Sequence, residues 1–338
     1  MTAPLSCIIG LSGTRLKKSE RLFLRDANPW GVILFARNVK DQDQLRKLTS
    51  DIRDAMGRDT LIFVDQEGGR VQRLRGPHWR AFPSGDDYAS IYKRNAEIGL
   101  RACYLGHRLI ADDLRAVGIT ANCAPVLDLP QPEADPIISD RALGNSVADI
   151  VDMAHSAMAG LMSGGVAPVI KHIPGHGRAE VDSHKELPKI TASRKILERS
   201  DFLPFRKLSD APMAMTAHAV YTHNSRTAVT ISRKSLTELI RAAIGFDGLL
   251  MTDDLDMKAL TGDLTRKTER AMKAGCDIAL QCSGRLADSV KVAKGALVLS
   301  GRGLGRAKVA EACAEHITQF DRVAAEAEFD ALFEHLSS

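Results

Sequence analysis

What this 338-residue chain lacks narrows its possible functions. No apolar run approaches the ~20 residues that a membrane-spanning helix requires. The first residues contain no basic region followed by a long apolar segment, so we expect no signal peptide. Lysines and arginines form no run interleaved with aromatic residues, and the formal net charge is only +4. Nucleic-acid binding and membrane association are therefore not expected.

The six cysteines form no pattern that points to chemistry. They are widely spaced, most of them in apolar contexts, and no two of them make a Cys-x-x-Cys pair. Buried free thiols in a reducing environment are the simpler interpretation. The composition, 44% hydrophobic and 26% charged, is ordinary for a globular protein with a sizeable core. We therefore expect a cytoplasmic protein.

Short apolar segments alternate with amphipathic ones along the whole chain. Strands are expected at residues 6–11, 31–36, 61–65, 119–126, 166–172, 212–217, 248–252 and 277–282. These runs are almost continuously apolar, which suits parallel strands buried on both faces. Helical spacing is clear over 98–109, 150–161 and 257–271, and the alanine- and glutamate-rich last fifty or so residues also favour helix.

Eight strands, each followed by a helix, predict an α/β fold of the (β/α)8 TIM-barrel type. We expect one catalytic domain over residues 1–338, with helices from about residue 285 packing on the barrel. A doubly wound sheet is the alternative, but Gly10-Leu11-Ser12-Gly13 lacks the third glycine of a dinucleotide-binding turn. Barrel enzymes carry their catalytic residues where strands end. Polar residues follow five predicted strands here, namely Asp65, Asp128, Lys171-His172, His218 and Asp253-Asp254.

One segment concentrates reactive side chains directly after a predicted strand. It runs Lys171-His172-Ile173-Pro174-Gly175-His176-Gly177-Arg178 and continues to Asp182-Ser183-His184. A proline and two glycines interrupt it, so it is predicted to be a loop rather than a helix or a strand. Reactive side chains on a loop that follows a rigid strand are a common arrangement in enzymes.

Two chemistries compete for this segment. A zinc site would use His172, His176, Asp182 and His184. However, His-x-x-x-His spacing aligns ligands only on a helix, and no glutamate stands as in His-Glu-x-x-His, so we expect no metal. The other interpretation is an acid/base pair, because residues two apart on an extended segment, here Asp182 and His184, face the same side. Such a pair can protonate a leaving group and later deprotonate water.

Three further clusters carry charge. The segment 65–73, Asp-Gln-Glu-Gly-Gly-Arg-Val-Gln-Arg, suits a polyhydroxylated ligand, although a solvated turn with internal salt bridges has the same composition. Asp140-Arg141 offers a guanidinium that either clamps a ligand or is merely solvated. At the end of a strand, Asp253 could attack the anomeric carbon of a sugar, while Asp254 or Asp256 caps the next helix.

Together these motifs resemble the bacterial family 3 glycoside hydrolases, specifically the single-domain β-N-acetylglucosaminidases (β-hexosaminidases) of peptidoglycan recycling. The resemblance covers nearly the whole chain, and its most specific part is Lys-His-x-Pro-Gly-His-Gly followed by Asp-Ser-His. The chain departs from the family pattern at three places. Thr252 replaces the usual serine, Asp256-Met257 replaces Ser-Met, and Arg178-Ala179-Glu180 stands where an acidic residue and threonines are common. The matching segments are 64–73, 140–141, 171–177, 182–184 and 253–255.

The resemblance implies an exo-acting retaining enzyme that releases terminal β-linked N-acetylglucosamine from muropeptides of the GlcNAc-1,6-anhydro-MurNAc type. Asp253 would be the nucleophile that forms a covalent glycosyl-enzyme, His184 the general acid and base, and Asp182 its partner. No cofactor is implied, and the partner would be a small amino sugar bound by a monomer or weak homo-oligomer. Phosphorolysis and a sugar-binding protein without catalysis are the alternatives. Residues implied in substrate binding are Asp65, Arg73, Arg141, Lys171 and His172.

Overall fold

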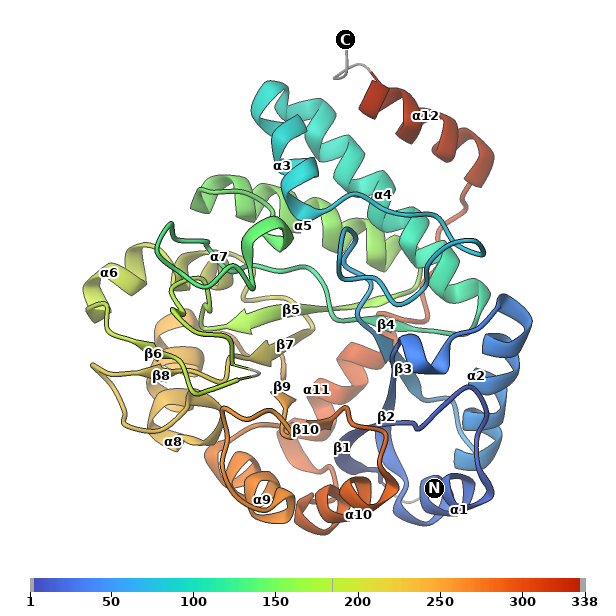
Figure 1. Ribbon diagram of the computed structural model, residues 1–338, viewed down its shortest axis with the longest axis vertical. Coiled ribbons are helices and arrows are strands. Elements are labelled where there is room, and N and C mark those ends of the chain that lie inside the picture. Colours follow the sequence, from blue (N-terminus) through green and yellow to red (C-terminus); the bar gives the residue numbers. More distant parts are fainter. Residues whose placement is uncertain (1–2, 184, 335–338) are drawn as a thin grey trace.

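A computed structural model describes residues 3–183 and 185–334 of the chain as a closed barrel of eight parallel strands (Figure 1). The order around the barrel is β1-β10-β9-β7-β5-β4-β3-β2, so the predicted (β/α)8 fold is confirmed. Each predicted strand has its counterpart. The barrel strands are β1 (Leu5–Gly10), β2 (Pro29–Leu34), β3 (Leu61–Val64), β4 (Ala121–Asn122), β5 (Ala167–Ile173), β7 (Met213–Thr216), β9 (Leu249–Asp254) and β10 (Ile278–Gln281).

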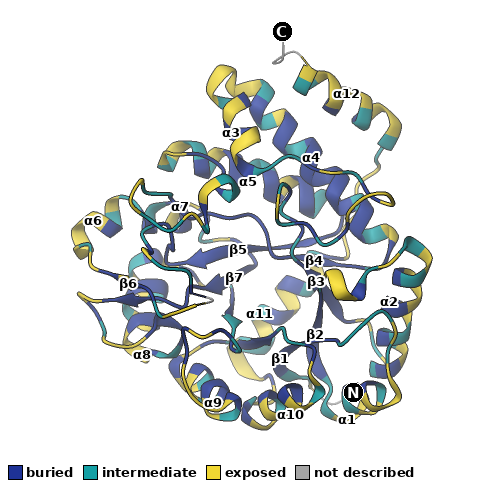
Figure 2. Cartoon of the chain, in the orientation of Figure 1, coloured by how far each residue is buried: buried dark blue, intermediate teal, exposed yellow. Residues whose placement is uncertain are grey.

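Helices surround the barrel with their apolar faces inward and their exposed faces outward (Figure 2). Serine, aspartate or asparagine side chains cap several helix N-termini, as in α5, where Ser146 accepts from the backbone N–H of Asp149. The helices are α1 (Lys18–Ala27), α2 (Gln42–Met56), α3 (Gly85–Arg94), α4 (Ala96–Ala116), α5 (Val147–Ser163), α6 (Arg194–Arg199), α7 (Phe202–Lys207), α8 (Arg233–Ser235) continuing as a π-helix (Leu236–Ile244), α9 (Leu264–Ala274), α10 (Leu286–Gly295), α11 (Gly301–Ala312) and α12 (Arg322–Glu334).

The interior of the barrel is a packed apolar core. Trp30 and Phe63 belong to this core, with ring centroids 5.7 Å apart. Ala307 and Ala310 of α11 belong to the same core, so this helix closes the end of the barrel at which the strands begin. The Trp30 indole N–H donates to Glu311 at 2.7 Å, which satisfies the one polar atom of that ring.

Strand β4 is much shorter than the predicted span of 119–126. The strand ends at Asn122, and Pro125 has no N–H to offer to a neighbouring strand. Pairing with β5 resumes at Val126, which forms an isolated bridge with Lys171. The chain that follows β4 therefore runs beside the end of β5, which matters for the site.

The helix expected from residue 257 begins later than predicted. Helix α9 starts at Leu264, and Asp263 caps it by accepting from the N–H of Thr265 at 2.9 Å. Neither Asp254 nor Asp256 caps a helix, so that expectation was wrong. The apolar residues between them and α9, such as Met257, are buried because the loop folds back over the barrel, which imitates a helical pattern.

Two smaller features lie outside the barrel. Strands β6 (Lys189–Ile190) and β8 (Val220–Tyr221) pair in parallel as a separate two-stranded sheet. Helix α12 packs on α4, where Phe329 is buried beside Tyr88. Within residues 3–183 and 185–334, no helix is both long and apolar enough to cross a membrane.

Candidate active site

A cavity of about 200 Å³ lies at the end of the barrel where the strands finish. Six of the site residues expected from the sequence line it, namely Asp65, Arg73, Arg141, Lys171, His172 and Asp253. Asp182 is described but is not among the lining residues, and His184 lies outside the described residues. The other residues that line the cavity had no individual role assigned from the sequence, although some of them belong to the segment 65–73 or to Asp253-Asp254; they are Ile33, Phe35, Glu67, Arg70, Val71, Ile137, Met215, Asp254, Met257, Leu280 and Cys282.

A network of buried charges forms one wall of the cavity. The Lys171 ammonium lies 3.1 Å from Asp65 Oδ1 and 2.6 Å from Glu67 Oε1. Arg141 grips Glu67 through two parallel hydrogen bonds of 2.8 Å, and Arg73 donates to Asp65 at 2.9 Å. The segment 65–73 is therefore not a solvated turn, and Arg141 is not a solvated loop residue.

Opposite charges hold this wall in its ionised form. Burial alone would raise the pKa of Glu67, but Arg141 and Lys171 outweigh it and lower that pKa to about 2. The pKa of Asp65 is likewise held well below its usual range by Lys171 and Arg73, against the effect of burial. For Lys171, burial would lower the pKa, yet Glu67 and Asp65 raise it well above the ordinary value. The wall therefore offers fixed donors and acceptors to a polyhydroxylated ligand.

Glu67 is the member of this network that sequence reasoning left unassigned. It belongs to the same short segment as Asp65 and Arg73, and its side chain is only 7% exposed. A carboxylate so buried needs a partner, and this one has two cations. Nothing local could reveal this, because Lys171 and Arg141 arrive from β5 and from the segment after β4.

Asp253 and Asp254 also line the cavity, at the end of β9. Asp253 Oδ1 accepts from the backbone N–H of Asp254 at 2.7 Å. Asp254 Oδ1 accepts from the N–H groups of Asp256 and Cys282, both at 3.1 Å, so this carboxylate is committed to the backbone of the loop. Burial raises the pKa of Asp254 to about 6, although those hydrogen bonds oppose the shift. The two neighbouring aspartates therefore have different environments.

The loop after β5 holds its shape through two buried aspartates. Asp128 accepts from His172 Nδ1 and from the backbone N–H of His176, both at 2.6 Å. Arg178 pairs with Asp201 at 2.7 Å and does not line the cavity. Arg178, where the chain departs from the family pattern, thus forms a salt bridge that anchors the loop.

Asp182 lies at the start of a turn in the loop after β5. The carbonyl of Asp182 accepts from the N–H groups of Lys185 and Glu186, at 2.9 and 3.1 Å, which is the pattern of a turn. Because His184 lies outside the described residues, the pairing of Asp182 with His184 stays a prediction. Ser183 is buried, and its carbonyl accepts from Ala259 at 3.2 Å, so the segment rests on the loop after β9.

The remaining departures from the family pattern also have structural partners. Thr252 is fully buried, and its hydroxyl accepts from the N–H of Leu280 at 2.9 Å, which joins β9 to β10. Asp256 pairs with Arg285 at 2.8 Å at the surface. Among the described residues, no group of three or more His, Cys, Asp or Glu side chains is arranged to hold a metal ion.

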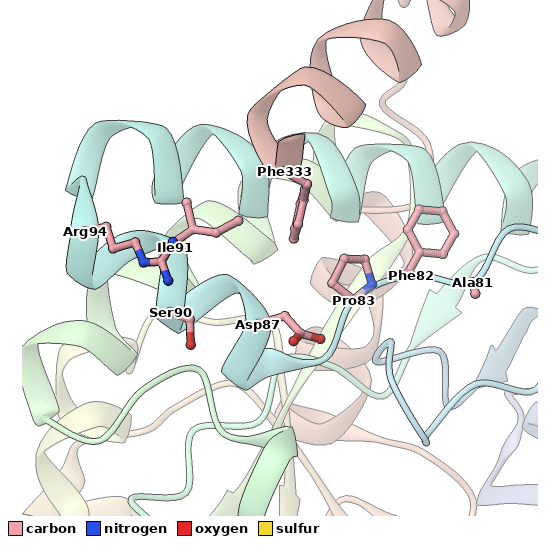
Figure 3. A pocket seen from close by; sticks show the side chains of 8 residues that line it. All are labelled: Ala81, Phe82, Pro83, Asp87, Ser90, Ile91, Arg94 and Phe333. Carbon is pink, nitrogen blue, oxygen red and sulfur yellow. The ribbon is translucent and has the colours of Figure 1, made fainter. Parts of the chain in front are cut away.

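A second, larger cavity of about 420 Å³ lies between α3 and α12 (Figure 3). Figure 3 shows Asp87, Ser90 and Ile91 on α3 and Phe333 hanging from α12. The Asp87 carboxylate caps α3 by accepting from the Ser84 N–H and hydroxyl, at 2.8 and 2.7 Å. Among the residues that line this cavity, none form a buried network of opposite charges. The cavity of about 200 Å³ at the strand ends, called the barrel mouth below, is therefore the better candidate site.

The fold and this site define a barrel glycosidase. The family model described as "Glycosyl hydrolase family 3 N terminal domain" matches residues 6–319 of the chain. The chain therefore belongs to glycosyl hydrolase family 3, and it is a glycoside hydrolase.

Individual relatives narrow the comparison. A beta-hexosaminidase of Alkalilimnicola ehrlichii is 40% identical over 283 residues, which cover 82% of this chain and 80% of that protein. The crystal structure of native NagZ from Neisseria gonorrhoeae is similar with a TM-score of 0.87 at 31% identity, covering 98% of both chains. NagZ from the same organism in complex with N-trifluoroacetyl-D-glucosamine gives a TM-score of 0.87 at 29% identity, again over 98% of both chains.

Proposed function

We propose that this protein is an exo-β-N-acetylglucosaminidase that releases terminal β-linked N-acetylglucosamine with retention of configuration. The β-N-acetylhexosaminidase activity agrees with the family and with relatives named beta-hexosaminidase. The single observation that carries the mechanism is that Asp253 and the charged wall line the same small cavity. A sugar ring held by that wall would present its anomeric carbon to a carboxylate at a strand tip.

In this mechanism, Asp253 attacks the anomeric carbon and forms a covalent glycosyl-enzyme while the aglycone departs. His184 protonates the leaving oxygen, then removes a proton from the water that hydrolyses the intermediate. Asp182 orients His184 and stabilises its charged form. Asp254, whose backbone N–H fixes one oxygen of Asp253, would keep the nucleophile in one orientation.

The substrate would be held through its hydroxyl groups by Asp65, Arg73, Arg141, Lys171 and His172. Support comes from the geometry, since all five line the cavity, and Asp65, Arg73, Arg141 and Lys171 are held in place by ion pairs with one another or with Glu67. Fixed charges of this kind need little reorganisation when a polar ligand binds. A similar structure, NagZ from Neisseria gonorrhoeae, was solved in complex with N-trifluoroacetyl-D-glucosamine, which agrees with an N-acylated amino sugar as the substrate of this chain.

The proposed natural substrate is a cell-wall muropeptide of the GlcNAc-1,6-anhydro-MurNAc type, cleaved in the cytoplasm by a single catalytic domain. A cavity of about 200 Å³ has room for little more than one sugar ring, which agrees with removal of a terminal residue. The aglycone would then extend outward over the loops. We propose that the enzyme works as a monomer or weak homo-oligomer and needs no cofactor.

The decisive test compares a chromogenic N-acetyl-β-glucosaminide with the matching β-glucoside. The wild type is expected to prefer the acetamido sugar strongly, and His184→Ala is expected to lose most turnover while still binding substrate. Equal turnover of both sugars would contradict the proposed substrate class. Undiminished turnover by His184→Ala would contradict the assigned acid and base.

Phosphorolysis is the second candidate, because a neutral imidazole in the acid/base role would not repel an incoming phosphate as a carboxylate does. The same assay in phosphate buffer separates the two reactions. Free N-acetylglucosamine as the product supports hydrolysis, whereas the sugar 1-phosphate would replace our proposal with a phosphorylase.

A further inference from the structure

Asp128 is a fully buried carboxylate that touches the candidate site only through other residues. It follows β4 at the point where the chain runs beside β5, and it does not line the cavity. Its Oδ2 accepts from His172 Nδ1 at 2.6 Å, and its Oδ1 accepts from the N–H of His176 at 2.6 Å. The backbone N–H of His172 also points at this carboxylate, at 3.2 and 3.3 Å from its two oxygens.

These contacts are too many and too well buried to be incidental. Burial alone would raise the pKa of Asp128, but His172 and His176 hold it below its ordinary value, so the group remains an anion. The two loops are also in close backbone contact, because a side chain at Gly177 would place its Cβ 1.9 Å from the carbonyl oxygen of Leu129. The loop after β5 therefore packs closely against the segment after β4, and Asp128 makes the polar contacts between them.

An ionised carboxylate can only accept hydrogen bonds, so the short contact fixes where the proton of the His172 ring lies. Nδ1 must carry hydrogen and donate it to Asp128. In the neutral ring, Nε2 then carries the lone pair and is the nitrogen left for the cavity. Three cationic side chains of the cavity, Lys171, Arg73 and Arg141, can only donate, so an accepting imidazole would complement them.

We propose that Asp128 is a positioning residue that locks His172 in the Nδ1–H tautomer, so that His172 Nε2 accepts a hydrogen bond from a hydroxyl group of the bound sugar. The proposal rests on the proposed function for the identity of the sugar, but not for the tautomer. Asp128 itself touches no substrate. It determines whether the histidine beside the sugar accepts or donates.

The test is Asp128→Asn, which keeps the shape of the side chain but replaces one accepting oxygen with an amide that donates. The His172 ring is then expected to switch to the Nε2–H tautomer. In the wild type, 15N NMR of histidine-labelled protein, assigned with His172→Gln, should show a protonated Nδ1 and an unprotonated Nε2, and the variant should show the reverse. KM for the chromogenic N-acetyl-β-glucosaminide should rise roughly tenfold, the usual effect of one lost hydrogen bond, with a smaller change in kcat.

Asp201→Asn is the matched control, since Asp201 is an equally buried aspartate that anchors the same loop through Arg178. It should leave the His172 tautomer unchanged. The double variant of Asp128→Asn with His172→Ala should have nearly the same KM as His172→Ala alone, because the effect of Asp128 passes through that ring.

An Nε2–H tautomer or a charged ring in the wild type at neutral pH would overturn the proposal even if Asp128→Asn does not fold. So would a penalty from Asp128→Asn that persists undiminished without the His172 ring, or a tautomer change in Asp201→Asn. Failure of the proposed function looks different, because the wild type would then not turn over the acetamido sugar although the NMR result stands.

Discussion

Of the two cavities described above, the one between α3 and α12 is larger, whereas the one at the barrel mouth has more charged side chains. The cavity between α3 and α12 has about 420 Å³, twice the 200 Å³ of the barrel mouth. Its polar residues come mostly from one helix, whereas the mouth gathers charged side chains from several strand ends and their loops. Convergence of charges from distant parts of the chain, not volume, marks the place where bond chemistry can be organised.

The largest expected effect comes from removing the proposed nucleophile. Asp253→Asn should lower kcat/KM by on the order of 10⁴-fold or more, because a carboxamide cannot form the glycosyl-enzyme. The matched control, Asp87→Asn, changes an aspartate in the α3–α12 cavity in the same way and should alter kcat/KM by less than about twofold. Steady-state kinetics on both variants check this. Similar losses in the two would erase the functional contrast between the cavities.

The next effect concerns stability at the barrel mouth. Glu67→Gln leaves Arg141 and Lys171 with one buried anion fewer, and should lower the free energy of unfolding by about 3 kcal/mol, as for other broken buried ion pairs. The control is Glu328→Gln, which breaks the exposed pair with Arg101 and should change stability by about 0.5 kcal/mol at most. Urea denaturation at pH 7 compares them. If both variants had equal stability, the buried network would be no stronger than a surface pair.

A third effect is the pH dependence of stability, which should differ between the carboxylates of the barrel mouth. The pKa of Asp254 is raised from 3.8 to about 6 by burial, so between these values the native state holds more protons than the unfolded chain. Stability contributed by the protonated group is therefore present below pH 3.8 and lost as the pH rises through 6. Asp254→Asn, which keeps the accepting oxygen, should remove this loss, worth ~3 kcal/mol as an order of magnitude.

The measurement is the free energy of unfolding of the wild type minus that of Asp254→Asn, followed from pH 4 to pH 7. The difference should fall as the pH rises. A difference that is flat or that rises would mean that Asp254 resembles Asp65, whose depressed pKa gives the opposite slope.

The smallest effect is expected in the larger cavity. Phe333→Ala removes a partly buried ring that packs on Tyr88, and should cost about 1–2 kcal/mol of stability, less than a fully buried phenylalanine. Its kcat/KM should match that of the wild type. Thermal unfolding and steady-state kinetics on the same preparation check both statements. A change in kcat/KM greater than about threefold would connect this cavity to the chemistry.

Much of the fold could be predicted because its signals are local. Each barrel strand is an apolar run, and glycine or a capping side chain often marks where a helix begins or ends, as at Ser146 and Gly275. The exceptions arose where tertiary contacts override local pattern. Met257 is buried by a loop that folds over the barrel, and its apolar spacing with Leu260 and Leu264 predicts a helix that in fact begins only at Leu264.

The candidate site was predictable in part for a different reason. Parallel strands that close into a barrel bring their ends to one face, so polar residues after the strands meet whatever the details. This placed Asp65, Lys171 and Asp253 around one cavity. It could not predict Glu67, whose two cations arrive from elsewhere in the chain, or the turn at Asp182, which depends on the packing of that loop.

The sequence by itself determined the barrel, the face that carries the chemistry and the residue types available there, because period, capping and strand ends are properties of short segments. Tertiary structure alone decided how those residues pair. The bidentate grip of Arg141 on Glu67, the contact of Asp128 with His172 and the raised pKa of Asp254 all depend on groups distant in sequence. Electrostatic interactions act over a few ångströms of space, and only the folded chain determines which charges are that close.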